Sequence, residues 1–335
     1  MNAADDAGKP HSRPGPARIV WNPDRTGRTP EAAAVDERPL PPDDDPVANA
    51  ARVAAILASD TYQPADRDLG LLATDTLRGV RLALDYEKTE LLLTQQGLAH
   101  AIVVFGSARI REPEIARREL EAAREALRAS PGDAALAAAA RIAERLAAHA
   151  EHYEAAREFG RLVGASQPRS GQHRVVIMTG GGPGIMEAAN RGAYDVGAQS
   201  VGLNVTLPRE QSPNPYVSPE LCVSFHYFAM RKLHFLRRAR ALVAFPGGFG
   251  TLDELFETLT LIQTGKMAPV PVVLVGRRFW DRAIDVDFLL AEGMLSPGDR
   301  NLVYFAESAA DAWRHIRDWH ARSGTTGFPG TGVTP

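Results

Sequence analysis

The sequence predicts an α/β fold: a doubly wound parallel sheet with helices on both faces, extended by an inserted helical hairpin. Short apolar stretches typical of buried strands alternate along the chain with segments of helical period. Three of these stretches run directly into glycine-rich turns, as strands do where a parallel sheet passes into a helix. The 335 residues, 44% of them hydrophobic, are enough for one large domain of this class.

Six strands are expected in the order of the chain, over residues 101–105, 175–178, 200–205, 221–225, 241–245 and 270–275. Helical periods occupy residues 185–196, 229–238, 251–264 and 309–320. In a parallel sheet of this kind the ligand crevice lies at the carboxyl ends of the strands. The loops that follow the strands are therefore the place to look for a site.

Residues 113–167 form a different kind of segment between the first two predicted strands. A helix rich in Ala, Arg and Glu is followed by a break at Ser130–Asp133 and then by a second long helix, for which Asp133 is the expected N-cap. We interpret the segment as an inserted helical hairpin. The pattern favours a solvated or dimer-packing role for it.

The folded domain is expected over residues 69–322. Residues 1–68 are rich in Pro, Asp, Ala and Arg without a sustained apolar period, so a mostly disordered tail is predicted there. The Gly-, Pro- and Thr-rich residues 323–335 predict a second disordered tail.

The composition of the chain limits which kinds of partner it binds and in which compartment it is found. The net charge of −3 gives no general attraction to nucleic acid or to an anionic membrane. No apolar run approaches the roughly 18 to 20 residues of a membrane span, and the N-terminus does not resemble an export signal. The single cysteine, Cys222, excludes an intrachain disulfide framework and fits a reducing cytosol. The sequence therefore predicts a soluble cytoplasmic protein.

Three glycine-rich loops end predicted strands and point to an anion site. They are Gly106–Arg109, Thr179–Glu187 and Pro246–Glu254. Glycine lets the backbone N–H groups approach an anion, and the N-terminus of the helix behind adds partial positive charge. Because all three loops follow strands of one sheet, we expect them to converge on one crevice.

Two features that the sequence lacks indicate which kind of phosphate compound the loops bind. None of the loops has the Lys-Ser or Lys-Thr pair of a nucleoside triphosphatase. The strand after the second loop ends at Asn204–Pro208 without the acidic residue that holds the ribose of a dinucleotide. A mononucleotide or a sugar phosphate is therefore favoured over ATP or NAD.

Two charged side chains near these loops are candidates for chemistry, each with a structural alternative. Glu254 follows the third loop, but Thr251 and Glu254 also match a capping box, in which the carboxylate only closes the helix end. Arg231 can hold a phosphate with its planar fork, or it can belong to an ordinary basic helix face. For Glu257, one turn after Glu254, a structural or ribose-orienting role is favoured. No metal site is expected, because His226 and His234 lack metal-binding spacing.

The pair Arg231-Lys232, followed by Pro-Gly-Gly-Phe-Gly-Thr-Leu-Asp-Glu ending at Glu254, resembles the signatures of the LOG family. Its members are cytokinin riboside 5'-monophosphate phosphoribohydrolases, often labelled lysine decarboxylases. The resemblance extends from about Ala101 to Val275, interrupted by the hairpin. It implies a Rossmann-like domain without a cofactor, which forms a homodimer or a larger homo-oligomer.

The resemblance also implies an activity and a set of site residues. The activity is hydrolysis of the N-glycosidic bond of a purine nucleoside 5'-monophosphate, either AMP or a cytokinin nucleotide, to free base and ribose 5-phosphate. Arg231 and Glu254 correspond to the catalytic pair. The implied substrate-binding residues are Gly106, Ser107, Gly181, Gly182, Gly184, Lys232, Gly247, Gly248, Gly250 and Thr251.

Two other functions compete with hydrolysis. A lysine decarboxylase needs a lysine that forms a Schiff base with pyridoxal phosphate, and the predicted domain offers only Lys88, Lys232 and Lys266. A non-catalytic module that binds a nucleotide or cofactor would use the same glycine loops. Such a module would have no reason to carry both Arg231 and Glu254.

Overall fold

The computed structural model describes residues 45–166, 174–206, 212–325 and 328. The chain divides into two compact units, residues 1–84 and 85–335. No helix in the described part of the chain is both long and apolar enough to span a membrane.

The second unit is built on a seven-stranded parallel sheet with the order β4-β3-β2-β1-β5-β6-β7. The chain adds strands outward from β1 to β4, then returns to place β5 on the other side of β1. The point where the order reverses therefore lies between β1 and β5, which is where such sheets bind ligands. The strands are β1 (His100–Phe105), β2 (Val175–Thr179), β3 (Ser200–Val205), β4 (Cys222–Phe225), β5 (Ala239–Ala244), β6 (Val272–Val275) and β7 (Val303–Ala306).

Helices cover both faces of this sheet, because alternate residues of each strand point to opposite sides. On one face, Ile102 and Val104 pack in a core with α6 (Glu151–Ala165), α7 (Ile185–Asp195) and α12 (Ala309–Arg322). On the other, Val103 and Phe105 pack with the end of α3 (Arg78–Gln95), α8 (Phe228–Arg237), α9 (Phe249–Gln263) and α10 (Arg277–Ala283). The doubly wound prediction is confirmed.

The six predicted strands are present, with ends that differ by a few residues, and a seventh was missed. Strand β7 has only four residues, of which three are half-buried, so its apolar pattern is weak. The helices α3, α10 and α11 (Val286–Ala291) were also not predicted. Short helices and edge strands depend on the contacts of the folded sheet more than on their own sequence.

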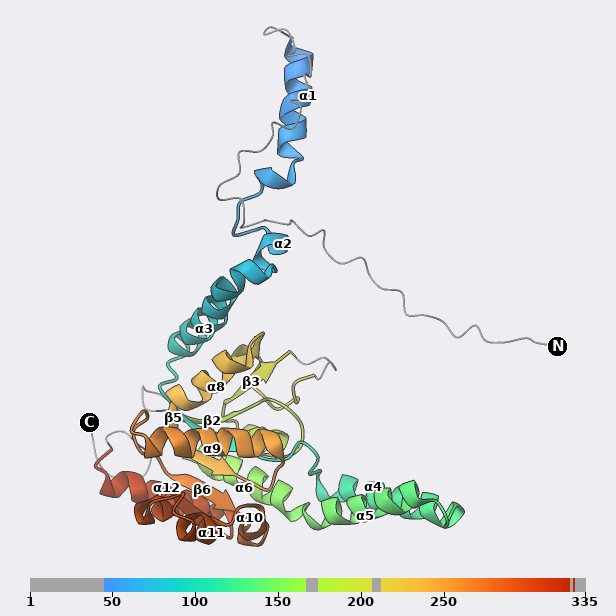
Figure 1. Ribbon diagram of the computed structural model, residues 1–335, viewed down its shortest axis with the longest axis vertical. Helices are drawn as coiled ribbons and strands as arrows, with labels where there is room; N and C mark the ends of the chain where they lie inside the picture. Colours follow the sequence, from blue (N-terminus) through green and yellow to red (C-terminus); the bar gives the residue numbers. More distant parts are fainter. Residues whose placement is uncertain (1–44, 167–173, 207–211, 326–327, 329–335) are drawn as a thin grey trace, which may run out of the picture. The chain divides into compact units, whose positions relative to one another are not determined.

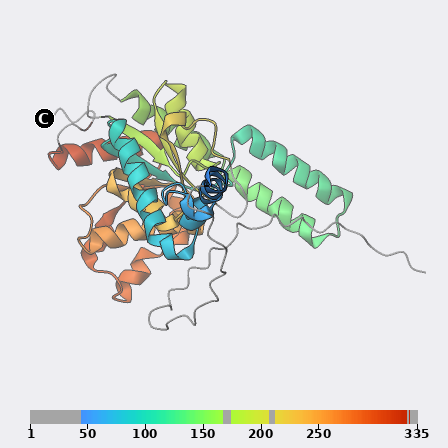
Figure 2. The ribbon, with the colours of Figure 1, turned by 90° about the horizontal axis from the view of Figure 1, so that it is seen from above.

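The inserted segment contains three helices rather than two. α4 (Pro113–Ala129) and α5 (Ala134–Ala148) form the hairpin, extend beyond the sheet and lie side by side (Figures 1 and 2). As predicted, the Asp133 carboxylate caps α5, accepting the Ala135 and Leu136 N–H groups at 2.7 and 3.1 Å. The predicted second helix was too long: it breaks near His149, and α6 beyond the break covers the sheet. Its Phe159 and Val163 are fully buried.

The structure describes parts of the two predicted tails. Residues 1–44 lie outside the described residues, but Asp45 caps α1 (Pro46–Leu57), whose first residue is a proline, the residue type that suits this position. The 3-10 turn Asp60–Tyr62 follows, and the short helix α2 (Leu69–Leu72) and the turn Asp75–Leu77 precede α3. At the other end, Phe328 is buried in the second unit against Trp313 and His320. Residues 326–327 and 329–335 of that tail lie outside the described residues.

Candidate active site

The three glycine-rich loops meet at the carboxyl ends of β1, β2 and β5. The Ser107 N–H donates to the Pro246 carbonyl at 3.0 Å, and the Ser107 carbonyl accepts the Ile185 N–H at 3.1 Å. The loop after β1 thus holds the other two together. The predicted convergence of the loops is present in the structure.

Two glycines make this close approach possible. A Cβ atom on Gly184, whose φ is +74°, would lie 2.4 Å from the Ser107 carbonyl oxygen. A Cβ atom on Gly106 would lie 2.5 Å from Cγ2 of Ile185. Any larger residue at either position would push the first two loops apart.

The loop after β5 leaves open space in front of its backbone. No atom lies within 4 Å of where Cβ atoms of Gly248 and Gly250 would be, and both residues are exposed. Gly247 instead lies against the side chain of Thr251, which is buried. The N-terminus of α9, with its partial positive charge, is therefore accessible at these two glycines.

The second loop is more enclosed than the sequence suggests. Gly181 and Gly182 are both buried, and the Gly181 N–H donates to Oγ1 of Thr179 at 2.9 Å. Since that N–H already has a hydrogen-bond partner inside the protein, Gly181 stabilises the conformation of the loop. Of the glycines expected to bind phosphate, those after β5 have the more accessible backbone.

A buried polar network behind the second loop was missed by the sequence analysis. Thr179 donates to Oδ1 of Asn190 at 2.7 Å, and the Asn190 amide donates to Oγ of Ser200 at 2.9 Å. The Asn214 amide donates to the Gly182 carbonyl and to Oδ1 of Asn190, each at 3.0 Å. Buried polar groups require such partners, so the network fixes the loop. Its only signal in the sequence is polar side chains inside otherwise apolar elements.

Arg231 lies on α8 with its guanidinium against the second loop. A Cβ atom on Gly180 would be 2.9 Å from Nη2 of Arg231. The rings of Phe228 and Phe235 lie 5.4 and 5.3 Å from the guanidinium carbon, and Nε has no hydrogen-bond partner among the described residues. Burial lowers the pKa of Arg231, while the charge of Glu254 opposes this shift. This enclosed position rules out an ordinary solvated helix face.

Glu254 lies on α9, 4% exposed, with Oε2 lacking a hydrogen-bond partner in the described part of the chain. Burial raises the pKa of its carboxyl group to about 7, although the charges of Lys232 and Arg231 act in the opposite direction. The capping box is not formed. The helix begins at Phe249 with Gly248 as its N-cap, so Thr251 lies within the first turn.

Lys232 joins α8 to α9 beside this pair. Its Nζ lies 3.0 Å from the Asp253 carboxylate and 2.9 Å from that of Glu257. Glu257 therefore makes a contact between the two helices. These ion pairs hold the helix of Arg231 against the helix of Glu254.

A second contact that the sequence analysis missed fixes the start of α8. The Asp85 carboxylate, on α3, accepts the N–H groups of His226 and Tyr227 at 2.9 Å each. Deeper in the same helix, His234 is fully buried, with Nδ1 3.1 Å from Glu90. Neither histidine belongs to a group of three potential metal ligands within the described residues.

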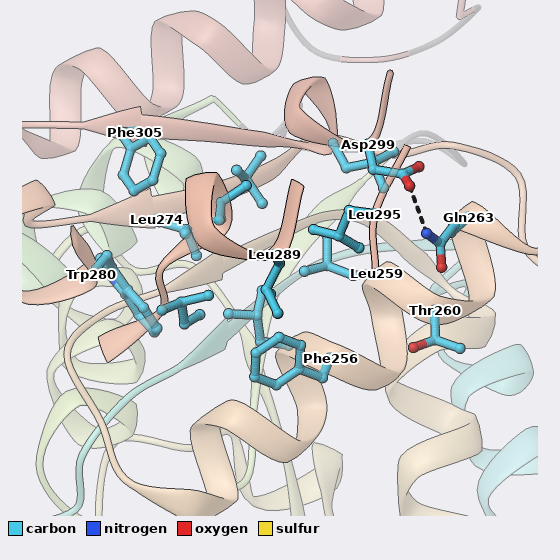
Figure 3. A pocket seen from close by; sticks show the side chains of 15 residues that line it. Phe256, Leu259, Thr260, Gln263, Leu274, Trp280, Leu289, Leu295, Asp299 and Phe305 are labelled. Atoms are coloured by element: carbon cyan, nitrogen blue, oxygen red, sulfur yellow. Dashed lines mark hydrogen bonds between the residues drawn. The ribbon is translucent and has the colours of Figure 1, made fainter. Parts of the chain in front are cut away.

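The other face of α9 borders an apolar cavity of about 120 Å³. Figure 3 shows Leu259, Leu289 and Trp280 among the carbon-rich side chains around it, with the hydrogen bond between Gln263 and Asp299 among its few polar groups. The cavity lacks the charged groups that the glycine loops bring together. We therefore place the candidate active site at the loops.

Comparison with known proteins gives matches over the same region. The sequence profile of a family described as "Possible lysine decarboxylase" matches residues 186–316, which include Arg231 and Glu254. The cytokinin riboside 5'-monophosphate phosphoribohydrolase LOG7 of Arabidopsis thaliana is 28% identical over 152 residues, 44% of this chain and 69% of that protein. The enzyme LOG of Oryza sativa subsp. japonica, with the same description, is 29% identical over 140 residues, 41% of this chain and 56% of that protein.

Solved structures align less closely. The molybdenum cofactor binding protein of Rippkaea orientalis is 21% identical, with a TM-score of 0.36, over 50% of this chain and 87% of that chain. The resemblance indicated by the motifs is confirmed by the family profile and the sequence relatives.

Proposed function

Because the chain is related to the LOG family, we propose that it hydrolyses the N-glycosidic bond of a purine nucleoside 5'-monophosphate. The products are the free base and ribose 5-phosphate. The observation that carries the proposal is the buried carboxyl group of Glu254, with a pKa of about 7, near Arg231 where three glycine-rich loops meet. A group with such a pKa is suited to accept a proton at neutral pH.

The reaction needs a general base, which accepts a proton, and a group that stabilises positive charge on the ribose. Water attacks C1′ of the ribose as the bond from C1′ to the base nitrogen breaks, through a state resembling an oxocarbenium ion. Ionised Glu254 stabilises that charge and takes the proton released by the water. The leaving nitrogen takes up a proton from solvent as the nucleobase departs, and Glu254 later returns the proton of the attacking water to solvent. The reaction therefore consumes one water and leaves the protonation of the enzyme unchanged.

The 5′-phosphate is assigned to the glycine loops and Arg231. Gly248 and Gly250 have accessible backbone at the start of the 15-residue helix α9, whose N-terminus favours an anion. Gly106, Ser107 and Gly184 form the adjoining wall. Gly181, Gly182, Gly247, Thr251 and Lys232 support the site through the contacts described above, so their assigned part is to hold the loops and helices in place.

The proposal extends to the base, the assembly and the compartment. The relatives LOG7 and LOG are named for cytokinin riboside 5'-monophosphates, so AMP and cytokinin riboside 5'-monophosphates are the substrates to test. We assign the protein to the cytoplasm. We also expect it to form a homodimer or a larger homo-oligomer, and light scattering on the purified protein measures this oligomeric state. Decarboxylation is disfavoured because Lys232, the lysine next to the site, is engaged by two carboxylates.

The test is release of free base from a panel of nucleoside monophosphates, followed by chromatography. We expect adenine from AMP and little from adenosine, because adenosine lacks the phosphate that the loops hold. Replacing Glu254 with Gln should lower the rate about 10²- to 10⁴-fold, the usual contribution of a general base. Glu292→Gln, which removes an exposed carboxylate that takes no part in the ion pairs of Lys232, is the control and should retain most activity.

Two results would count against hydrolysis. Release of base at the same rate by Glu254→Gln and the native protein would remove Glu254 from the mechanism. Binding of AMP without release of base from any monophosphate would instead favour a non-catalytic nucleotide-binding module.

A further inference from the structure

A second cavity, of about 740 Å³, lies between the α5–α6 junction and the end of β6. It shares no lining residue with the candidate active site. We call it the basic pocket; the residues that define it are Arg145, His149, His152, Arg278, Phe279 and Arg282. Its volume falls within the range of roughly 300 to 1,000 Å³ that small-molecule sites occupy.

Its three arginines are available to a ligand. The guanidinium groups of Arg145, Arg278 and Arg282 make no hydrogen bond or ion pair with the part of the chain that the structure describes. Other arginines of this unit are engaged, such as Arg157, which pairs with Asp195, and Arg191, which pairs with Glu112. Three unpaired guanidinium groups around one hollow attract an anion, and each can bind phosphate oxygens in a bidentate manner.

The acidic residues that border the pocket do not cancel this charge. Glu151 and Glu307 have side chains that are 78% and 71% exposed. Glu307 lies 3.8 Å from Arg277, which is outside the lining, and Glu151 lies 4.0 Å from His152. The balance of formal charge among the lining residues stays positive when both histidines are neutral.

The histidines and Phe279 add flat surfaces to the pocket. The rings of His149 and His152 stack with centroids 5.6 Å apart, and Phe279 meets His149 edge to face at 6.0 Å. Burial lowers the pKa of both histidines, so the neutral rings are favoured at pH 7. A Cβ atom on Gly276, at φ +87°, would lie 2.7 Å from Cε1 of His152, so a glycine is needed for the ring to lie there.

We propose that the basic pocket binds a nucleotide that carries at least two phosphate groups, such as a nucleoside diphosphate. The arginines hold the phosphates, and the aromatic rings pack against the planar base. The inference does not depend on the proposed hydrolysis, because the two sites use different residues. Two of the lining elements, α5 and the start of α6, come from the segment inserted after β1, so the pocket gives this insertion a function.

The test is calorimetric titration of the whole protein with ADP, pyrophosphate and adenosine. To weaken binding at the candidate active site, the titrations are made in the Arg231→Gln variant, which should leave the basic pocket intact. ADP should bind more tightly than pyrophosphate, and adenosine should bind least. Affinity for ADP should fall as salt rises from low to physiological concentration, because exposed arginines are screened.

The decisive variant replaces Arg145 and Arg278 with glutamine in the same background. Each lost charge-assisted contact should weaken ADP binding about tenfold, so a loss of about a hundredfold is expected. The matched control replaces Arg141 and Arg277, which lie on the same two helices but do not line the pocket. It should bind ADP within about twofold of the parent.

Three results would overturn the inference. They are unchanged ADP affinity in the Arg145/Arg278 variant, equal losses in the pocket and control variants, and adenosine binding as tight as that of ADP. Thermal unfolding of each variant without ligand checks the fold, and all four substituted arginines are exposed, so their replacement should leave it intact.

Discussion

Glu254 is costly to bury in its charged form, and this cost is informative about its role. A carboxylate without a hydrogen-bond partner for one oxygen destabilises the folded state unless it takes up a proton. Its helix is already capped by the backbone of Gly248, so the carboxyl group does not close a helix end. Perturbed groups of this kind are concentrated at functional sites, where their cost is offset by other contacts.

The raised pKa of Glu254 predicts a specific pH dependence of stability. Its pKa rises from 4.5 to about 7 on folding, so the folded protein binds this proton more tightly. The free energy of unfolding should therefore fall as pH rises from about 4.5 to 7, by up to about 3 kcal/mol from this group. Glu254→Gln removes the effect, so its stability relative to the native protein should increase over that range, as measured by urea unfolding at several pH values.

The control for this prediction is again Glu292→Gln, since that side chain is exposed and is not among the groups that shift the pKa of Glu254. A difference between Glu254→Gln and the native protein that does not change with pH would contradict the assignment of a raised pKa.

At the scale of elements, the start of α8 is stabilised by a contact from a helix that is distant in the sequence. Its N-cap, Tyr227, makes no capping bond with its side chain. The Asp85 carboxylate, which lies on α3, accepts a hydrogen bond at the start of α8 instead. Asp85 is 141 residues from His226 in the sequence. Because Arg231 follows one turn later, the same contact sets the position of its guanidinium.

Replacing Asp85 with Ala should therefore affect both stability and catalysis. The loss of a cap costs about 1 kcal/mol, and hydrolysis should slow further because Arg231 is no longer held at the second loop. Asp85→Asn keeps an acceptor oxygen and should restore part of the rate. Steady-state kinetics alongside urea unfolding separates the two effects.

Glu87→Ala is the matched control, because it removes an exposed carboxylate from the same helix without a contact to α8. Equal losses of activity in the Asp85 and Glu87 variants would rule out a positioning role for Asp85.

At the scale of the molecule, the second unit is stabilised by two apolar cores, one on each face of the sheet. The core on the α6, α7 and α12 face includes Phe328, which is 4% exposed and stacks on His320 at 3.9 Å. Burial of this ring ties part of the C-terminal segment to the domain. The burial of Phe328 could not be predicted from the composition of residues 323–335. A single aromatic residue among glycines and prolines gives no repeating apolar pattern.

Phe328→Ala should lower the free energy of unfolding by about 3 kcal/mol, the usual cost of removing a buried phenylalanine ring. The matched control is Phe249→Ala in the third loop, where the ring is 93% exposed. It should change stability by less than about 0.5 kcal/mol. Similar midpoints of urea unfolding for the two variants would mean that Phe328 does not belong to the core.

The sequence by itself determined the features that depend on local pattern. Alternating strand and helix periods predicted the sheet and its two covering layers, because burial on both faces leaves a direct mark on residue type. Glycine-rich turns after three strands indicated the candidate site, because close approach of backbones excludes side chains. The motifs at Arg231 and Pro246–Glu254 indicated the family.

Only the tertiary structure decided what depends on neighbours distant in the chain. It excluded the capping box for Glu254, gave the Gly181 N–H an internal partner, and brought Asp85 to the start of α8. It also divided the inserted segment into a hairpin and a covering helix, and it gathered the arginines of the basic pocket from α5 and α10. Burial, pKa and charge pairing are set by the atoms packed around a group, so no local pattern contains them.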